Sequence, residues 1–222
     1  HGKQCDKYHS KGCFYTRTTG IWQTVWLEFV PRMYLKSVQV TTDYRMGSVT
    51  FLATVNELPK ALTLRTSISF DGKPCASFET PLSAGGTIYT MQVGDVKCWD
   101  ILQPNLYDVT YELLDGNAVI DTVQSYFGFR TVELREHSLW LNGRPIFQRL
   151  VLDQGYYPDG VYTAPTDADL KRDIELSIAL GFNGARLHQK VFEERFLYWA
   201  DRLGYLVWGE QASWGLDITT SE

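Results

Sequence analysis

Two contrasting sequence patterns meet near Arg130, and they restrict the fold more than any other feature. From Ser37 to Arg130, apolar and polar residues alternate in short runs that end in turn sequences such as Asp71-Gly72 and Gly85-Gly86. Alternating strands separated by such turns at intervals of about ten residues are typical of an antiparallel β-sandwich. The segment therefore predicts a sandwich of about the size of an immunoglobulin domain.

Aromatic residues are frequent in this segment and allow two interpretations. They could form a carbohydrate-binding face, or they could fill the core of the sandwich. Because a strand in a sandwich buries every second residue, core packing is the better interpretation. It applies to Trp99, Tyr107, Tyr111, Phe127 and Phe129.

After Arg130 the pattern indicates strands that alternate with helices. A hairpin over 131–152 turns at Asn142-Gly143, a dipeptide preferred in two-residue turns. Thr166, with Asp169 three residues later, predicts the start of a helix that ends at Gly181. Its apolar face consists of Leu170, Ile174 and Ile178.

The alternation continues to residue 208. A short apolar strand over 182–186 is followed by a helix that ends at Gly204 and by a second strand over 205–208. The apolar face of this helix consists of Phe196, Ala200 and Leu203. Such alternation predicts parallel strands with right-handed crossovers. A doubly wound sheet and a (β/α)8 barrel both fit, but three strands complete neither, so the chain is expected to end inside this domain.

Composition excludes several classes of protein. Of the 222 residues 44% are hydrophobic, and 21 Lys+Arg against 26 Asp+Glu give a net charge of −5, which does not fit a disordered chain. Apolar runs are much shorter than the roughly 20 residues of a membrane span, and no basic stripe indicates nucleic-acid binding. We therefore expect neither a membrane nor a nucleic acid as a partner. The cysteines Cys5, Cys13, Cys75 and Cys98 form no Cys-x-x-Cys pair, which favours isolated thiols over a disulfide framework or a metal site.

Both ends of the chain indicate a segment cut from a longer protein. The sequence starts at His1 instead of a methionine, and residues 217–222 show no pattern of a helix or a strand. Because a signal peptide could have preceded His1, the localisation stays open.

Residues 15–30 predict an aromatic β pair with a turn at Gly20, too short to be a domain. Trp22 and Trp26 lie four residues apart, so in a strand they would share one face. We expect both rings to pack this segment against a neighbouring domain.

Four segments carry a resemblance to a known family: GIWQTVWLE over 20–28, FGFR over 127–130, LNGRPIFQR over 141–149, and NGAR with FLYWADRLGYLVW within 183–208. Together they resemble glycoside hydrolase family 2, the β-galactosidase and β-glucuronidase type enzymes. The resemblance implies a multi-domain β plus α/β fold. Residues 1–34 would be the last strands of a jelly-roll sugar-binding domain, 35–130 an immunoglobulin-like β-sandwich, and 131–222 the first three strands of a TIM-barrel catalytic domain.

The barrel signature of that family matches here in spacing but not in every residue. Matching positions are Asn183, Arg186, Phe196, Leu197, Asp201, Gly204 and 205–208. In contrast, Gln189-Lys190-Val191 stands where the family has His-Tyr-Pro, Leu187-His188 replaces two small residues, and Ala185 replaces a larger apolar one. These departures leave the expected fold intact and the identity of the sugar open.

Polar and aromatic residues follow each expected barrel strand, where barrel active sites are built. Carboxylates, an arginine, a histidine and aromatic rings on one rim suit sugar recognition, since hydroxyls need hydrogen-bonding groups and pyranose faces pack on rings. The expected substrate-binding residues are Asp153, Tyr156, Arg186, His188, Gln189, Glu210 and Trp214.

Several of these residues have a structural alternative. Arg186 could form an ion pair with Glu210 or contact the substrate, and the resemblance implies a residue that orients catalytic carboxylates. His188 could be a supporting histidine, because the histidine of the family aligns with Gln189. Asp153 could only cap the following loop.

Retaining glycoside hydrolysis needs two carboxyl groups about 5 to 5.5 Å apart. The resemblance places these glutamates after the fourth and seventh barrel strands, so no catalytic residue is expected in this chain and Glu210 is expected to be a wall residue. We also expect no metal and no cofactor, since the Glu-x-His that supplies magnesium ligands in some β-galactosidases has no counterpart in 211–215.

The expected function is a part of a retaining exo-β-glycosidase, inactive alone, that acts on β-galactosides, β-glucuronides or related sugars. Its expected partners are a carbohydrate and the rest of the barrel, whereas the oligomeric state stays open. The alternative is a non-catalytic sandwich that binds a carbohydrate or a protein partner. A flavodoxin-like protein is disfavoured because no Gly-rich phosphate loop follows the first strand. Open strand edges predict that the isolated chain associates.

Overall fold

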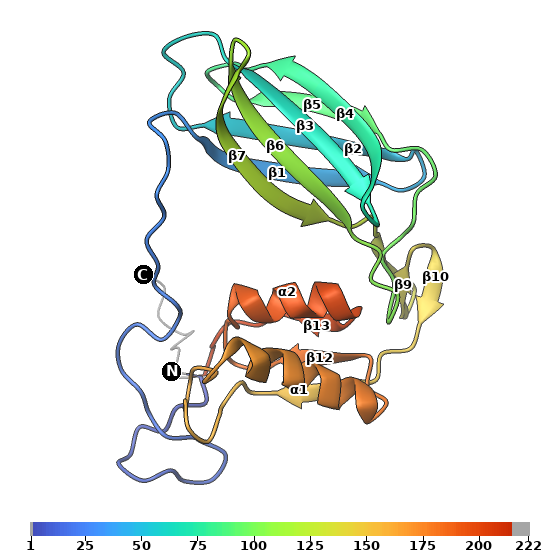
Figure 1. The fold of residues 1–222 in the computed structure, drawn as a ribbon. Helices are drawn as coiled ribbons and strands as arrows, with labels where there is room; N and C mark the ends of the chain where they lie inside the picture. Colours follow the sequence, from blue (N-terminus) through green and yellow to red (C-terminus); the bar gives the residue numbers. More distant parts are fainter. Residues whose placement is uncertain (1, 215–222) are drawn as a thin grey trace, which may run out of the picture. The chain divides into compact units, whose positions relative to one another are not determined.

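A computed structural model describes residues 2–214 of the chain (Figure 1). The chain divides into two compact units. One unit contains Leu27–Asp100 and Pro104–Ile146, and the other contains the residues up to Trp26, Ile101–Gln103 and the chain from Phe147 onward. The segment 217–222, used above to judge the end of the chain, lies outside the described residues.

The first unit is an antiparallel β-sandwich, as the alternating runs predict. Its four-stranded sheet has the order β4 (Lys73–Pro81), β3 (Thr63–Phe70), β6 (Tyr107–Asp115), β7 (Ala118–Phe127). Its three-stranded sheet has the order β1 (Leu35–Asp43), β2 (Ser48–Val55), β5 (Thr87–Gln92). Figure 1 shows the two sheets as facing layers.

Aromatic rings fill the core between these sheets. The ring centroids of Phe51 and Tyr89 lie 5.2 Å apart, and those of Tyr107 and Phe127 lie 5.5 Å apart. The predicted core aromatics are all buried, with exposed fractions of at most 6%. The core interpretation of these side chains is therefore confirmed.

A small antiparallel sheet follows within the same unit and contains β8 (Val132–Arg135), β9 (Ser138–Leu141) and β10 (Arg144–Ile146). The predicted turn joins β9 to β10, with φ of 52° at Asn142 and 76° at Gly143. Both central residues of a type I′ turn need positive φ, which explains why this dipeptide occurs here. The Asn142 side chain also donates a hydrogen bond of 2.9 Å to the Trp99 carbonyl.

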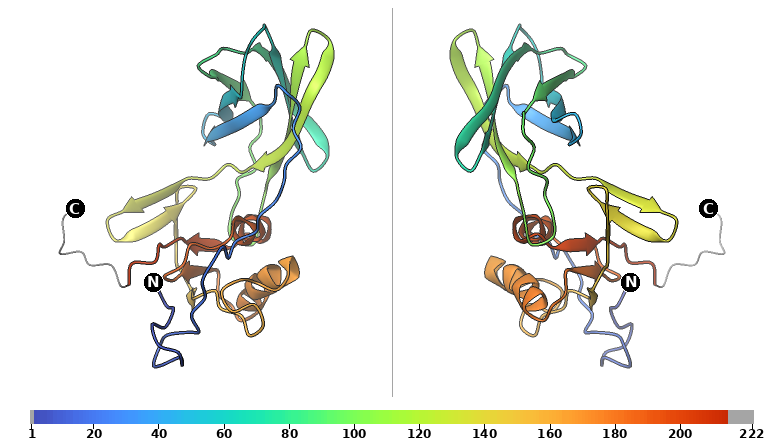
Figure 2. Two further views of the ribbon diagram at one scale, coloured as in Figure 1. Left: turned by 90° about the vertical axis from the view of Figure 1, so that its left-hand side faces the viewer. Right: turned by 90° about the vertical axis from the view of Figure 1, so that its right-hand side faces the viewer.

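The second unit contains the predicted strand–helix alternation: β11 (Leu150–Asp153), α1 (Asp167–Ala179), β12 (Gly184–Leu187), α2 (Glu194–Leu203) and β13 (Leu206–Trp208). The three strands pair in parallel in the order β11-β12-β13. Figure 2 shows both helices on the same side of these strands, as two successive crossovers of the same hand require. Neither helix is long and apolar enough to span a membrane in the part of the chain that the structure describes.

Local signals determine the ends of both helices. The Thr166 hydroxyl accepts a hydrogen bond from Asp169 N and caps α1 as predicted. Gly204, at φ 69°, adopts the left-handed conformation that ends α2. The buried face of the two helices and β12 includes Leu170, Ile174, Ala185, Leu187, Phe196 and Ala200.

Close packing of the strands depends on Gly184 and on Asn183, the signature residue that precedes it. Gly184 faces β13 so closely that a Cβ atom would lie 2.4 Å from the Leu206 carbonyl oxygen. The Asn183 side chain accepts a hydrogen bond from Arg149 N and donates one to the Phe147 carbonyl, both at 2.8 Å. These contacts fix the chain that enters β11 beside β12.

The β pair predicted over 15–30 is wrong. Apart from an isolated bridge between Gln4 and Tyr15, the described residues before Leu35 form no strand. Trp22 contacts the ring of Tyr162 at 4.6 Å, whereas the side chain of Trp26 is 68% exposed, so the two tryptophans do not share a face. The physical reason is that alternation stabilises a strand only beside a hydrogen-bonding partner, and the described residues provide none. The jelly-roll origin of 1–34 stays a prediction.

Candidate functional site

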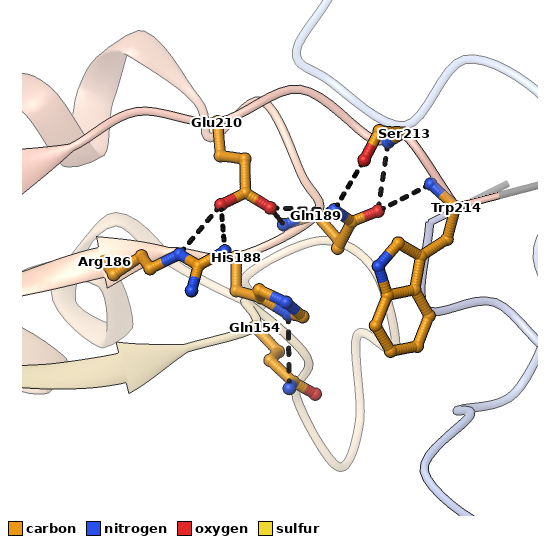
Figure 3. Close-up of polar contacts among 7 residues, drawn as sticks. All are labelled: Gln154, Arg186, His188, Gln189, Glu210, Ser213 and Trp214. Carbon is orange, nitrogen blue, oxygen red and sulfur yellow. Dashed lines mark hydrogen bonds and ion pairs between the residues drawn. The ribbon is translucent and has the colours of Figure 1, made fainter. Parts of the chain in front are cut away.

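The carboxyl ends of β11, β12 and β13 form one edge of the parallel sheet. Arg186 pairs in register with Leu152 on one side and Trp208 on the other. The loops after the three strands therefore start at the same level. The strand ends and these loops carry all seven predicted site residues, of which Asp153 ends β11 and Arg186 lies in β12. Figure 3 shows five of the seven, with Gln154 and Ser213.

Arg186 and Glu210 form the ion pair that was one of the two alternatives for the arginine. Oε2 of Glu210 lies 2.9 Å from Nε and 2.8 Å from Nη2 of Arg186 (Figure 3). Burial raises the pKa of Glu210, but hydrogen bonds from Arg186 and Gln189 outweigh this effect and hold the pKa below its ordinary value. Glu210 is thus an ionised acceptor at neutral pH, which suits a wall residue better than a general acid.

Gln189 lies at the centre of the network and is only 4% exposed. Its Nε2 donates to Glu210 Oε1 at 2.8 Å and to Ser213 Oγ at 2.9 Å, and its Oε1 accepts from the backbone N–H groups of Ser213 and Trp214. Both N–H bonds and both lone pairs of the amide are therefore occupied. This side chain connects the loop after β12 to the loop after β13.

His188 follows the end of β12 and is buried against Trp214, with ring centroids 5.7 Å apart and nearly perpendicular planes. Burial lowers the pKa of His188, so the imidazole is neutral at pH 7. Nδ1 lies 3.4 Å from the amide nitrogen of Gln154. Because that nitrogen can only donate, Nδ1 accepts and the ring proton resides on Nε2.

Asp153 is the last residue of β11, and Tyr156 lies in the loop that follows it. Oδ1 of Asp153 accepts a hydrogen bond of 2.8 Å from Gly155 N, which is the capping contact considered as its structural alternative. Burial raises the pKa of Asp153 against the opposing effect of that bond. The Tyr156 ring stacks on Tyr15 at 4.1 Å, and its buried hydroxyl has no hydrogen-bonding partner among residues 2–214.

Lys190 is a buried charge that sequence reasoning missed as a site residue. It is 1% exposed, its Nζ donates 2.8 Å hydrogen bonds to the carbonyls of Gly155 and Tyr162, and Glu193 lies 3.8 Å away. Gly155 has a φ of 63°, and a Cβ atom there would lie 2.9 Å from Nζ. The only sequence signal was the lysine in place of the tyrosine of the family signature.

Lys3 is a second residue that the sequence did not single out. Its Nζ lies 4.1 Å from the ring centroid of Trp214 and 5.9 Å from that of Phe14. The backbone N–H of Gly2 donates a 3.2 Å hydrogen bond to the Trp214 carbonyl. The N-terminal segment therefore adds a cation to the edge formed by the strand ends.

The four cysteines are free thiols, as expected. Within residues 2–214, no three or more His, Cys, Asp and Glu side chains gather to form a metal site. A cavity of about 260 Å³ adjoins Glu210. Its other lining residues are Leu187, Val191, Phe192, Leu197, Gly209 and Gln211.

Proteins with similar sequences are glycosidases by name. The chain is 29% identical over 198 residues to a putative β-glucuronidase of Formosa agariphila. The aligned region covers 86% of this chain and 24% of that protein. The chain is also 28% identical over 209 residues to a β-galactosidase of Vibrio vulnificus. Here the aligned region covers 86% of this chain and 20% of that protein. The chain thus spans about a quarter of the length of these relatives.

Solved structures share the fold. A glycosyl hydrolase family 2 member from Bacteroides cellulosilyticus matches with a TM-score of 0.72 at 24% identity, over 81% of this chain and 26% of that one. A β-glucuronidase from Ruminococcus gnavus matches with a TM-score of 0.68 at 20% identity, over 82% of this chain and 30% of that one. Residues 33–130 match the model of the glycosyl hydrolases family 2. Sequence, fold and the family model together show that the chain is similar to the glycosyl hydrolases family 2.

Proposed function

We propose that the chain is part of a retaining exo-β-glycosidase, with an immunoglobulin-like sandwich over 35–130 and the start of a TIM barrel over 131–222. Three in-register parallel strands with both crossover helices on one side are the repeating unit of such a barrel. The residues 1–34 would complete a jelly-roll domain in the whole protein. The names of the relatives support β-galactosides or β-glucuronides as substrates.

The observation that carries this proposal is the polar network at the carboxyl ends of the strands. Arg186 is half exposed, and after its contacts with Glu210 its Nη1 group has no partner among the described residues. A guanidinium fixed in this way can donate to sugar hydroxyls, and the indole of Trp214 offers an apolar surface to a pyranose ring. In this proposal Gln189 and Asp153 position the loops and do not contact the sugar.

The chain would supply a wall of the sugar pocket and not the reacting carboxylates. Glu210 is occupied by Arg186 and Gln189, and retaining hydrolysis needs a second carboxyl group about 5 to 5.5 Å from the first. We therefore expect the 222-residue chain alone to leave aryl β-galactosides and β-glucuronides intact. The whole protein in which the chain occurs should hydrolyse one of them.

The decisive experiment assays that whole protein with and without Arg186→Met. The expected result is hydrolysis with retention of the anomeric configuration and a large loss in the variant, with Arg172→Met, an exposed arginine on α1, as control. Hydrolysis by the isolated 222-residue chain, or an inactive whole protein, would contradict the proposal.

A second candidate function, a sandwich that binds a carbohydrate without catalysis, is favoured by one cavity. It measures about 380 Å³, lies within the sandwich unit between the segment 28–40 and strands β6 and β7, and includes Tyr111 and Asp121 in its lining. The buried Tyr111 hydroxyl has no hydrogen-bonding partner among residues 2–214. Sugar binding that Tyr111→Phe abolishes and Arg186→Met does not affect would favour this alternative.

A further inference from the structure

Lys3 is a buried ammonium group without a counter-ion. The residue is 5% exposed, yet among the residues that the structure describes no carboxylate lies within 4.0 Å of Nζ and no carbonyl accepts a hydrogen bond from it. The other buried lysine, Lys190, differs in this respect, because its Nζ donates to two carbonyls and has Glu193 nearby. Buried charges in proteins are normally paired and hydrogen-bonded, so Lys3 requires an explanation.

The surroundings of Lys3 fix its position without neutralising its charge. The ammonium lies 4.1 Å from the centroid of the Trp214 ring, close enough for a cation–π interaction. The preceding residue, Gly2, has a φ of 58°, and a Cβ atom there would lie 2.5 Å from the Gln189 carbonyl oxygen. The segment thus approaches the loop after β12 more closely than any other residue type would allow.

Other charges on the same edge are already compensated or absent. Arg186 is paired with Glu210. His188 contacts the same Trp214 ring as Lys3 and is neutral at pH 7. Lys3 therefore provides the uncompensated positive charge beside Trp214. An anion that reached this edge would gain a charge-assisted hydrogen bond in a partly desolvated position.

We propose that Lys3 binds an anionic substituent of the carbohydrate ligand, either a carboxylate or a sulfate ester, beside Trp214 and His188. This inference rests on the proposed sugar-recognition function and adds the chemical class of the sugar. A neutral hexose would satisfy Arg186 but would leave Lys3 unpaired, whereas an acidic sugar satisfies both.

The test measures binding to the full 222-residue chain by calorimetry and by the NMR signal of the Trp214 indole. Methyl β-D-glucuronide and methyl β-D-glucoside differ only in the carboxylate, and a 6-O-sulfated methyl β-D-galactoside compares sulfate with carboxylate. We expect at least one acidic sugar to bind about tenfold more tightly than the neutral glucoside, as one charge-assisted hydrogen bond allows. The acidic sugar that binds more tightly, the glucuronide or the sulfated galactoside, shows whether Lys3 prefers a carboxylate or a sulfate ester.

Three variants assign the preference to Lys3. Lys3→Met retains the apolar stem against the rings and should reduce the preference to about one, with neutral-sugar binding unchanged, whereas Lys3→Arg should retain it. Lys11→Met removes an exposed lysine from the same segment and should have no effect. Thermal melts of each variant verify that it folds.

Three outcomes overturn the inference. The first is equal binding of acidic and neutral sugars by the unmodified chain. The second is a preference for acidic sugars that survives Lys3→Met. The third is a loss of that preference in Lys11→Met as large as in Lys3→Met, which would indicate only long-range attraction. Equal binding of both sugars would leave the proposed sugar-recognition function standing. Binding of neither sugar would also overturn the inference about Lys3, whereas the proposed function is tested separately by the assay of the whole protein.

Discussion

The side-chain amide of Gln189 donates a 2.8 Å hydrogen bond to Oε1 of Glu210 and accepts two backbone hydrogen bonds from the loop that follows β13. A single side chain thus satisfies groups from two strand ends. The order of the edge depends on it, because Ser213 N and Trp214 N use the Gln189 carbonyl oxygen as their acceptor.

Replacement of this amide should destabilise the second unit. In Gln189→Leu the backbone N–H groups of Ser213 and Trp214 lose their acceptor, and Glu210 Oε1 keeps only the backbone donor of residue 189. We expect a loss of about 2 to 3 kcal/mol in the free energy of unfolding. Urea denaturation followed by tryptophan fluorescence measures it. The matched control is Gln211→Leu, an exposed glutamine nearby. A loss below that of the control would show that the network is not maintained in solution.

Removal of the guanidinium in Arg186→Met should raise the pKa of Glu210. Burial raises this pKa and the hydrogen bonds of Arg186 and Gln189 lower it, so loss of the arginine shifts the balance upward. The ion pair is partly exposed, and its contribution to stability should be about 1 kcal/mol or less. Because the folded-state pKa lies below the ordinary 4.5, that contribution is present above pH 4.5 and is lost as the pH falls. Titration of the glutamate carboxyl carbons by NMR measures the pKa, and an unchanged value would contradict the ion pair.

His188 should make the folded chain sensitive to mild acid. Its pKa is lowered from 6.5 mainly by burial, so the unfolded chain takes up this proton more readily than the folded chain. The stability is then fully present above pH 6.5 and decreases as the pH falls toward the folded-state pKa. Urea midpoints between pH 7.5 and 5.5 should decrease in the unmodified chain and less in His188→Gln. An identical decrease in both chains would assign the effect to other groups.

Lys190 should be among the most sensitive positions of the second unit. In Lys190→Met the carbonyls of Gly155 and Tyr162 lose their donor, and buried Glu193 loses the nearby cation. We expect a loss of about 2 to 4 kcal/mol in the free energy of unfolding. Lys171→Met removes a partly exposed ion pair with Glu175 and a cation–π contact with Trp199, and it should change the free energy of unfolding by less than about 1 kcal/mol. Equal effects of the two substitutions would show that Lys190 is solvated in solution.

Much of the fold was predictable because the relevant signals are local. Thr166 caps its helix through a residue three positions away, Gly204 ends its helix through its own backbone conformation, and Asn142-Gly143 forms a two-residue turn. None of these features needs knowledge of a distant segment. The prediction of a strand pair over 15–30 was wrong for the opposite reason, because a strand depends on a hydrogen-bonding partner that the local sequence does not specify.

The position of the candidate site could be predicted from the sequence, but the hydrogen bonds among its residues could not. Parallel strands bring their carboxyl ends together, so the seven residues could be assigned to one edge. Their roles depend on burial, which arises only in the folded chain: Gln189 and Asp153 are occupied by contacts within the protein. Lys3 could not be found from local pattern, because Trp214, the ring that its ammonium contacts, is 211 positions away in the sequence.

The approach of Gly155 to Lys190 restricts how this chain can vary in evolution. Any side chain at 155 would collide with the ammonium group and with the Phe192 ring, where a Cβ atom would lie 2.7 Å away. Substitution at 155 therefore requires Lys190 and Phe192 to shift or to change, and the φ of 63° disfavours residues other than glycine at this position. Homologous sequences should show these positions changing together, so that the lysine at 190 and the glycine at 155 are inherited as a pair.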